Sequence, residues 1–563
     1  MRVKKTERVF TKVNNIKEYL EVLKSHGDKT LYRWLDSKNT YTSNTYSEFL
    51  ELVLSIAKGY QNAGLSGKRI AIIGETSVEW VASYIATLTA GGVVIPMDKE
   101  LDVAAIEGFL ETAEAEAIVY SKTFNTKLAH FAETHPTLKK LIPMDATVEA
   151  EGKILPLAAL IEAGRAEEQF EISTRPTDEL AVMLFTSGTT GTSKCVMLCE
   201  RNIWSTVNSA CETVEFFPDD TIVSVLPLHH TYELACMLAA LDYGMTVGIN
   251  DSLRHIMKNF AEFKPTGLVL VPLFVNTMYN RIIETAKKNG KLGLLRFMMK
   301  VSNALRHVGI DLRRKLFKDV LNAFGGNIRK IVSGGAPLNP EMMKEFDSFG
   351  ITIAEGYGIT ECSPLISVNP YFALKSGSVG PAVPSCTVRI DKRGTNDKGF
   401  DEGEIQVKGD NVMLGYYKND EENAKAFTED GWYRTGDIGY MDADGYIFIT
   451  GRLKSVIVLE NGKNVFPEEI EEYLEKIDEI GEVVVVGRKA EDGETVKLTA
   501  IVYPKPDIYG ENPDKEKAYS DIHAKILNLN RTLPSFKQLK ALEIRETPFE
   551  KTTSRKIKRH LVK

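Results

Sequence analysis

Short apolar runs alternate with segments of helical periodicity over the first 180 residues. Residues 46–63 and 77–90 carry apolar side chains at the spacing of one helix face, whereas 69–74 (RIAIIG) and 92–96 are short continuous apolar runs, typical of buried strands. This alternation predicts a parallel or mixed sheet with helices on both faces. Similar strand-like runs recur further along, at 180–185, 221–226, 267–271, 328–332 and 351–354.

The pattern changes near Gly377. From there to residue 450 the chain is rich in Gly, Asp and turn dipeptides between short alternating strands such as 403–408, which predicts a small β-rich subdomain. A third pattern follows Gly451, where a helix that Pro467 opens, two strands and a further helix predict a compact α+β unit of about 110 residues. These helices are expected over 467–477 and 520–533, and the strands over 482–486 and 497–503.

The predicted fold class is therefore α/β, with a large N-terminal body and a small α+β C-terminal domain. We place the boundary at Gly451-Arg452, so that the body spans 1–451 and the C-terminal domain 452–563. The body is expected to hold two α/β-layered subdomains over about 1–376 and the β-rich subdomain over about 377–450.

The composition narrows the class of protein. Of the 563 residues, 43% are hydrophobic and 26% are charged, which excludes a disordered chain, a fibrous repeat and a miniprotein stapled by disulfides. The net charge of −7 argues against a chain-wide nucleic-acid surface. The chain contains no run of 18 apolar residues, the length that a helix needs to span a bilayer. The N-terminus lacks the apolar stretch of a signal peptide and the six cysteines form no C-x-x-C pair, so we expect a cytoplasmic enzyme.

The strongest local signal is a segment rich in glycine and hydroxyl side chains, LFTSGTTGTSKC, at 184–195. Glycines let the backbone approach a ligand closely, hydroxyls and backbone N–H groups donate to phosphate oxygens, and Lys194 adds a positive charge. It is not a Walker A loop, because Ser193 and Cys195 stand where that pattern needs Gly and Ser or Thr. A phosphate-binding loop is predicted, with a surface turn as the alternative.

Six motifs in order make the sequence resemble the adenylate-forming superfamily, which comprises acyl-CoA synthetases, nonribosomal adenylation domains and firefly luciferases. TSGTTGTSK resembles the phosphate loop of this family, SGGAP its adenine-side loop and YGITE its aromatic-Gly-x-Thr-Glu motif. YRTGD, GRLK and KTTSRK follow in the family's order. The motifs begin at residues 186, 333, 357, 433, 451 and 551, so the resemblance covers nearly the whole chain.

The resemblance implies a reaction in two steps. A carboxylate attacks the α-phosphate of ATP to give acyl-AMP and pyrophosphate, and the thiol of coenzyme A then attacks the acyl carbon and releases AMP. Both steps build charge on phosphate or carbonyl oxygens, so the protein mainly positions groups and neutralises charge. ATP, Mg²⁺ and coenzyme A are therefore expected as cofactors and co-substrates.

The resemblance also assigns roles to individual residues of the nucleotide site. Thr186 and Glu361 would hold Mg²⁺, because hydroxyl and carboxylate oxygens suit a hard cation. Asp437 would accept hydrogen bonds from both ribose hydroxyls with Arg452 in support, and Thr360 would contact the α-phosphate. The further expected contacts are Thr186, Ser187, Gly188, Thr189, Thr190, Gly191 and Lys194 at the β- and γ-phosphates, Gly335, Ala336 and Pro337 beside the adenine, and Glu355, Gly356, Tyr357 and Gly358, of which Tyr357 would stack on the base.

On the side of the acid, the family has an aromatic residue or histidine within the segment that resembles LPLHHTYE, near the point where the carboxylate enters. The register of this segment assigns that position to His230 rather than His229. Tyr232, Glu233 and Gly334 would line the acyl side. These residues complete the part of the site that the N-terminal body is expected to supply.

The C-terminal domain would supply Lys556, whose compact ammonium would bridge the carboxylate and the α-phosphate and so reduce their repulsion. Lys454 occupies the family's hinge position, about which a mobile C-terminal domain would rotate, and Gly462 and Lys463 would then approach coenzyme A. Arg555 stands where the family usually has glycine, while Lys551-Thr552-x-Ser554 keeps the family's spacing to Lys556. The alternative is a basic tail, since 551–563 hold six Lys and Arg and no acid.

Two features resemble the long-chain fatty acyl-CoA synthetases within the superfamily, and GKNVFPEEIE at 462–471 resembles their bacterial members. One is LPLHHTYE, and the other is a helical insertion at about 280–323. The apolar residues of this insertion would wall an acyl tunnel, touch a membrane surface or form ordinary helix core. They are Leu292, Leu294, Leu295, Phe297, Met298, Met299 and Val301.

The chain is accordingly expected to be a stand-alone long-chain fatty acid–CoA ligase with small-molecule substrates and no nucleic-acid partner. Alternatives stay open: the acceptor could be acyl carrier protein, the acid could be medium-chain or aryl, and a nucleotide-binding regulator without catalysis is a remote option. A homodimer and weak peripheral contact with the inner face of the membrane are compatible with the sequence.

Overall fold

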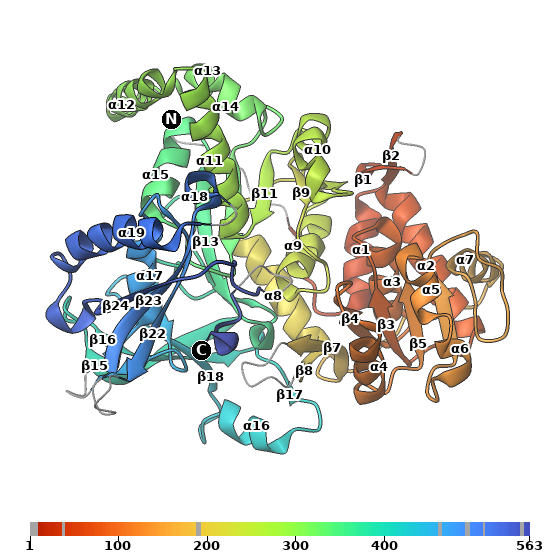
Figure 1. Cartoon of the computed structure of the whole chain (residues 1–563). Helices are drawn as coiled ribbons and strands as arrows, with labels where there is room; N and C mark the ends of the chain where they lie inside the picture. The colour runs from red at the N-terminus through yellow and green to blue at the C-terminus, as the bar shows by residue number, and fades with distance from the viewer. Residues whose placement is uncertain are drawn as a thin grey trace. The chain divides into compact units, whose positions relative to one another are not determined.

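The computed structural model describes residues 10–36, 40–186, 193–459, 464–489, 496–510, 513–551 and 557–562, without the side chains of Val458, Asn464 and His560. The chain forms two compact units (Figure 1). The first unit comprises Met1–Thr387 with Val407–Tyr433, and the second comprises Val388–Gln406 with Arg434–Lys563. Each unit has its own sheets and its own hydrophobic core.

Eight strands of the first unit form one mixed sheet: β1 (Thr30–Leu35), β2 (Tyr41–Thr45), β9 (Thr221–Ser224), β10 (Thr246–Ile249), β11 (Gly267–Leu270), β12 (Lys330–Gly334), β13 (Thr352–Gly358) and β14 (Leu365–Val368). Their order is β14-β13-β12-β11-β9-β10-β1-β2. The six central strands run parallel, and only the edge strands β14 and β2 pair antiparallel. The SGGAP and YGITE motifs therefore follow neighbouring parallel strands and meet at one edge of this sheet.

Seven strands form the second sheet of this unit: β3 (Arg69–Ile73), β4 (Val93–Met97), β5 (Ala117–Tyr120), β6 (Lys140–Pro143), β7 (Leu180–Thr186), β8 (Lys194–Cys199) and β17 (Gly415–Tyr416). Their order is β17-β8-β7-β4-β3-β5-β6, with β8 antiparallel to its neighbours β17 and β7 and the other pairs parallel. The glycine-rich segment thus connects the two strands of a β7–β8 hairpin.

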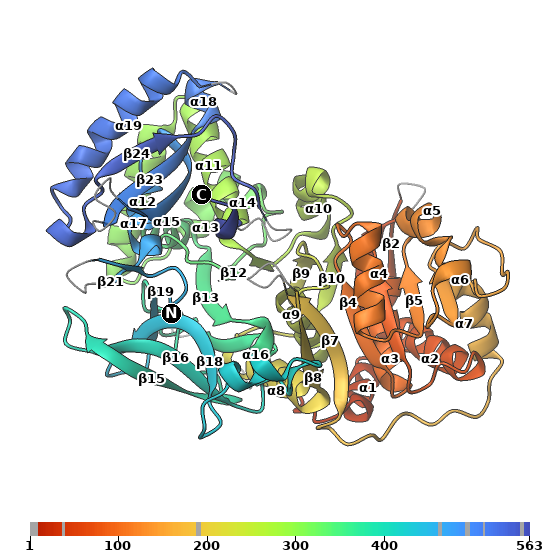
Figure 2. The ribbon, with the colours of Figure 1, turned by 60° about the horizontal axis from the view of Figure 1, so that its bottom comes forward.

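The helices of the first unit cover these sheets, and Figure 2 shows the third and fourth of them beside β4 and β5. Local signals set their ends: Thr45 and Glu48 form a capping box at the start of the second helix, and Ser77 caps the third. The helices are α1 (Ile16–Ser25), α2 (Tyr46–Asn62), α3 (Val78–Thr89), α4 (Val103–Thr112), α5 (Asn125–Leu128), α6 (Phe131–Thr134), α7 (Leu157–Arg165), α8 (Glu200–Thr213), α9 (Thr231–Asp242), α10 (Ile256–Phe263), α11 (Pro272–Lys288), α12 (Leu292–His307), α13 (Arg313–Leu316), α14 (Lys318–Asn322), α15 (Pro340–Phe349) and α16 (Asp420–Ala426).

The second unit holds most of a four-stranded sheet, a short ribbon and a three-stranded sheet. Its strands are β15 (Cys386–Thr395), β16 (Asp401–Gly409), β18 (Tyr433–Met441), β19 (Ile447–Arg452), β20 (Ile457–Val458), β21 (Asn464–Val465), β22 (Ile480–Lys489), β23 (Val496–Pro504) and β24 (Ala541–Ile544). Its helices are α17 (Pro467–Leu474), α18 (Pro506–Tyr509) and α19 (Lys515–Asn530). Apolar residues of α17 and α19 pack on β22, β23 and β24 to form one core.

These elements agree with the predicted α/β class, in which two α/β-layered subdomains are followed by β-rich and α+β parts. Several predicted bounds were wrong by a few residues. The strand predicted at 328–332 begins at Lys330, and the helix predicted at 520–533 begins at Lys515, because Asp514 accepts hydrogen bonds from the next turn and caps it. The domain boundary at Gly451-Arg452 falls within β19 and stays a prediction.

Candidate functional site

The β7–β8 hairpin sets the two ends of the predicted phosphate loop. Thr186 ends β7, Lys194 begins β8, and the two residues are register partners. Thr186 Oγ1 lies 3.4 Å from the carbonyl oxygen of Lys194. The five loop residues predicted to bind phosphate lie outside the described part of the chain. They are Ser187, Gly188, Thr189, Thr190 and Gly191.

A chain of polar contacts joins Lys194 to Glu361. Lys194 Nζ lies 4.7 Å from the centroid of the Tyr416 ring and forms an ion pair with Glu422. The Tyr416 hydroxyl donates to Glu361 Oε1 at 2.9 Å. Burial, and after it the charge of Glu361, raises the pKa of Tyr416, so its hydroxyl stays protonated and can donate. An ammonium, a hydroxyl and a carboxylate are thus held side by side.

Tyr416 reaches this place because of a pairing that the sequence does not reveal. It lies in the two-residue strand β17, whose register partner for Tyr416 is Val196 of β8. A short strand at the end of the first unit therefore joins the hairpin that begins with Lys194. Sequence reasoning missed Tyr416, since no local signal separates it from its neighbour Tyr417.

The YGITE motif forms a tight turn after β13. Thr360 and Glu361 lie half-buried in the single 3-10 turn Thr360–Cys362. Gly358 is required there, because a Cβ at this position would lie 2.2 Å from the carbonyl oxygen of Pro364. The backbone N–H of Ile359 donates to the same oxygen at 3.0 Å, so the turn is closed immediately before the two predicted site residues.

The adenine-side residues lie at the ends of β12 and β13. In the register of these strands Gly334 is the partner of Gly356, and Glu355 accepts a hydrogen bond from the Leu338 N–H at 3.0 Å. This bond ties the loop after SGGAP to β13. Tyr357 is buried, and the loop residues Gly335, Ala336 and Pro337 are exposed.

Two adjacent histidines precede α9. The ring centroids of His229 and His230 lie 4.1 Å apart, and His230 is the N-cap residue of the helix. Burial, and after it the charge of His230, lowers the pKa of His229 to about 3, so His229 is neutral near pH 7. His229 Nε2 lies 3.5 Å from Asp98 Oδ2.

The structure brings together two of the predicted acyl-side residues. A Cβ on Gly334 would lie 3.2 Å from Cζ of Tyr232, so this glycine leaves room for the ring. The Tyr232 hydroxyl lies 3.3 and 3.2 Å from the carbonyl oxygens of Leu270 and Val332, which holds it against the ends of β11 and β12.

The third predicted acyl-side residue, Glu233, is buried and hydrogen-bonded to β9. It accepts a hydrogen bond from the Ser224 hydroxyl, and within the described structure its second oxygen has no hydrogen-bond partner. Burial raises the pKa of Glu233 to about 8, so the carboxyl is largely protonated at neutral pH.

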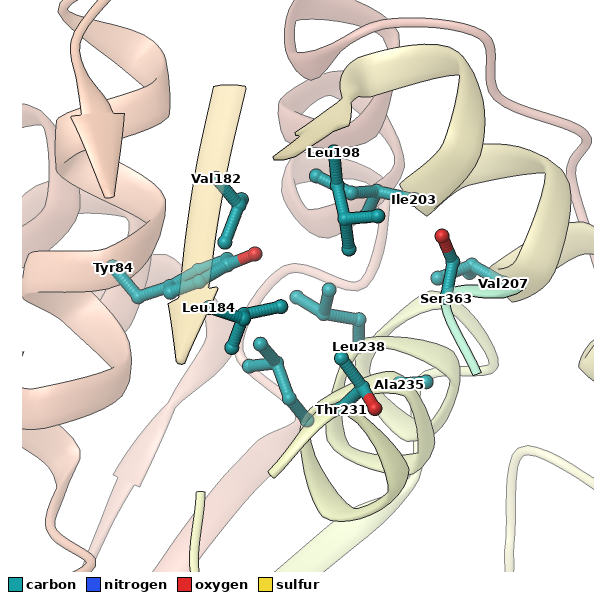
Figure 3. A pocket seen from close by; sticks show the side chains of 11 residues that line it. Tyr84, Val182, Leu184, Leu198, Ile203, Val207, Thr231, Ala235, Leu238 and Ser363 are labelled. Carbon is teal, nitrogen blue, oxygen red and sulfur yellow. The ribbon is translucent and has the colours of Figure 1, made fainter. Parts of the chain in front are cut away.

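A small apolar cavity lies within the first unit, lined in part by residues of α9 (Figure 3). It holds about 20 Å³, room for about one water molecule, between β7, β8, α8 and α9, and Thr231, the residue after His230, is one of its lining residues. Its walls are hydrocarbon except for three hydroxyl residues. The lining residues are Tyr84, Val182, Leu184, Leu198, Ile203, Val207, Thr231, Leu234, Ala235, Leu238 and Ser363.

In the second unit, Asp437 and Arg452 are register partners in β18 and β19, and Arg452 Nε lies 3.0 Å from Asp437 Oδ1. Asp437 is buried, so the arginine compensates its charge. The loop before Asp437 is tied to β16, because Glu404 accepts from the Gly436 N–H at 3.1 Å. Lys454 follows in an exposed turn.

The remaining predicted residues of this unit, Gly462, Lys463 and Lys556, lie outside the described residues, as does Arg555. Two neighbouring cations are engaged within the second unit itself. Lys551 Nζ lies 2.6 Å from Glu482 Oε1, and Arg559 forms ion pairs with Glu468 and Glu471. Lys551 and Arg559 are therefore not free solvated charges, as the alternative of a basic tail would have them.

Comparison with known proteins covers both units. Residues 20–417 match the AMP-binding enzyme family, and residues 454–563 match the AMP-binding enzyme C-terminal domain. The chain belongs to the AMP-binding enzyme family. The resemblance inferred from the six motifs is confirmed, and the fold class with it. The chain is an enzyme of the AMP-forming acyl-CoA ligase family within this group.

Two relatives and one solved structure illustrate the likeness. Long-chain-fatty-acid–CoA ligase FadD15 of Mycobacterium bovis is 30% identical over 475 residues, which are 79% of this chain and 76% of the relative. Long-chain-fatty-acid–CoA ligase 1 of Homo sapiens is 31% identical over 499 residues, 84% of this chain and 70% of the relative. ATP-bound MatB from Rhodopseudomonas palustris is similar with a TM-score of 0.75 at 26% identity, over 97% of this chain and 98% of that one.

One further property concerns membranes. Among the helices in the described ranges, none combines the length and the apolar character that crossing a bilayer requires.

Proposed function

We propose that this protein is an ATP-dependent long-chain fatty acid–CoA ligase. A carboxylate oxygen of the fatty acid attacks the α-phosphorus of ATP, and the bond to pyrophosphate breaks. The thiolate sulfur of coenzyme A then attacks the acyl carbon, and AMP leaves with the electron pair of the broken acyl–oxygen bond. The names of the relatives support the substrate class, since both compared enzymes are long-chain-fatty-acid–CoA ligases at about 30% identity.

The observation that carries the proposal is the cluster of Lys194, Tyr416 and Glu361. Lys194 would supply a fixed cation for the triphosphate. Glu361, which the buried hydroxyl of Tyr416 orients, would supply the hard anionic ligand that Mg²⁺ needs. Thr186 begins the loop at the same hairpin and would add its hydroxyl. Mg²⁺ would be held by Glu361 and Thr186 together with phosphate oxygens, and it would supply charge neutralisation at the phosphates.

Other residues would divide the remaining tasks. The exposed loop Gly335, Ala336 and Pro337 and the buried Tyr357 would contact the adenine, and Asp437 with Arg452 would bind the ribose. Lys556 would neutralise the two anions in the first step, and a C-terminal domain turning at Lys454 would present Gly462 and Lys463 to coenzyme A in the second. These assignments rest on the family resemblance.

The acyl chain would enter beside α9, where the small apolar cavity lined by Thr231 would have to widen to hold it. Its hydrocarbon walls suit a carboxylate whose tail is apolar, because leaving water lowers the free energy of the tail. Tyr232 and Gly334 would then border the carboxyl end.

A pyrophosphate-release assay with saturated fatty acids of graded length tests the proposal. We expect release that requires both ATP and Mg²⁺ and is fastest for chains longer than eight carbons, with AMP and acyl-CoA formed on adding coenzyme A. Release only with shorter or aryl acids would overturn the substrate class. Acyl transfer to holo acyl carrier protein but not to coenzyme A would overturn the acceptor. ATP binding without any release would favour a regulator.

A further inference from the structure

Helix α12 lies in the helical insertion of the first unit, in the green group with α11, α13 and α14 in Figure 1. Its 16 residues extend over about 24 Å at 1.5 Å per residue. The sequence leaves open whether its apolar residues form core, a tunnel wall or a membrane contact, and the structure shows that they divide between two faces.

The inner face of α12 is packed into the core of the unit. Met299 is buried in the cluster that also holds Phe346 and Phe349 of α15, and Leu295 and Met298 pack against it. Polar contacts fix the same face, because Asn303 Nδ2 donates to Ser348 Oγ at 2.8 Å. The orientation of the helix is therefore determined.

The outer face carries a stripe of exposed apolar residues. Leu294 is 54% exposed, Phe297 is 62% exposed and Val301 is 38% exposed, and Val308 just after the helix is 71% exposed. Together with Ala304 they occur at alternating intervals of three and four residues, so they follow a single line along the helix. A phenylalanine and a leucine displayed in this way on a fixed helix mark an interaction surface rather than scattered exposure.

Basic residues border this stripe on one side. Arg296, Lys300 and His307 occupy the neighbouring face of α12, and Lys291 precedes its first turn. From 287 to 318 the chain has ten Lys and Arg against one acid, Asp311, although the whole protein has a net charge of −7. Among the ion pairs between described residues, none involves Lys291, Arg296 or Lys300.

We propose that the outer face of α12 docks on an anionic lipid surface, lying in its interface without crossing it. Apolar side chains would enter the boundary between headgroups and acyl chains, and the basic border would contact the lipid phosphates. The local excess of positive charge favours this occupant, since the rest of the protein is acidic and a second copy would bring the same basic patch against itself. The surface differs from the catalytic cluster, and its binding needs neither ATP nor fatty acid.

The docking would serve a ligase for long-chain acids, because such acids reside in membranes rather than in water. The surface itself stands on α12 alone, so it can be right even where the substrate class is wrong.

The test is co-sedimentation of the full chain, without nucleotide or acid, with vesicles of phosphatidylcholine alone or with 30% phosphatidylglycerol. We expect binding to the anionic vesicles that decreases at high salt. Phe297→Ser should weaken it by about tenfold, because one large apolar side chain no longer enters the lipid. The double variant Arg296→Glu, Lys300→Glu should weaken it roughly 30-fold or more, from the loss of two attractive charges.

Matched controls alter the same residue types elsewhere on the first unit. Phe372→Ser removes another phenylalanine, which is 77% exposed, and Lys17→Glu with Lys24→Glu reverses two exposed charges of α1. Both controls should bind vesicles as the unmodified protein does, and all variants should keep its thermal unfolding midpoint. Equal binding to neutral vesicles, or equal losses in the α12 variants and their controls, would overturn the proposal. So would an unmodified dimer that Phe297→Ser converts to monomer while vesicle binding persists.

Discussion

The substitution Tyr416→Phe isolates the hydrogen bond on which the proposed metal and phosphate site depends. The phenylalanine ring keeps the contact with Lys194, whose Nζ lies 4.7 Å from the ring centroid, and removes only the hydroxyl that donates to Glu361 Oε1 at 2.9 Å. A hydrogen bond to a charged group contributes about 1.5–3 kcal/mol. If Glu361 must be oriented in the transition state, kcat/KM for pyrophosphate release should fall about 10- to 150-fold.

The measurement is initial rates of pyrophosphate release over a series of Mg²⁺ concentrations at saturating acid. The variant should need more Mg²⁺ for half-maximal rate, because a less well oriented carboxylate binds the cation more weakly. Tyr417→Phe is the matched control, since its hydroxyl lies 3.0 Å from Arg69 and not at Glu361. A kcat/KM for Tyr416→Phe within twofold of the unmodified enzyme, or a loss equal to that of the control, would refute the reasoning.

Further expectations concern three other positions. Gly358→Ala should lower the free energy of unfolding by about 1–3 kcal/mol in urea titrations, since its Cβ would lie 2.2 Å from a backbone oxygen, whereas Gly108→Ala, with open space around it, should be neutral or stabilising. Because the pKa of Glu233 is raised to about 8 from 4.5, its proton stabilises the fold below pH 4.5 and this contribution is lost as pH rises through 8. Glu233→Gln should therefore lose stability less steeply between pH 5 and 8 in melting curves, and parallel curves would contradict this. Lys556→Ala should lose acyl-AMP formation but keep thioester formation from supplied acyl-AMP, and equal loss of both steps would count against its assigned role.

Local structure was largely predictable from the sequence. The helices at 46–63 and 77–90 were predicted to within a residue or so, because Thr45 and Ser77 cap them and their apolar faces are continuous. The first residue of a strand was harder to predict where apolar residues precede it, as at β12. β24 was not predicted, because its four residues are only partly buried. Hydrophobic periodicity indicates which residues of a segment are buried, and such short segments contain too few residues to show it.

Pairing between distant segments was not predictable. β1 lies beside β10, more than two hundred residues further along, and β17 joins β8 although it is only two residues long. Neither choice of partner is encoded in a local pattern, since both depend on which strand edges remain open after the rest of the sheet has formed. Tyr416 was missed for this reason and not because its chemistry is unusual.

The residues that ordered motifs identify and those that only the structure identifies make different contributions to the same site. Thr186, Lys194 and Glu361 bear the groups that would contact phosphate and metal, and these follow from residue type and motif order. Tyr416 bears no such group, yet its hydroxyl donates to Glu361 and its ring supports Lys194. Preorganisation of this kind comes from the residues that contact the reacting groups. A tyrosine from any part of the sequence can make such contacts when the fold places it beside the site. A site inferred from motifs alone therefore contains the reacting groups but omits the contacts that fix their orientation, and it is these contacts that the Tyr416→Phe experiment weighs.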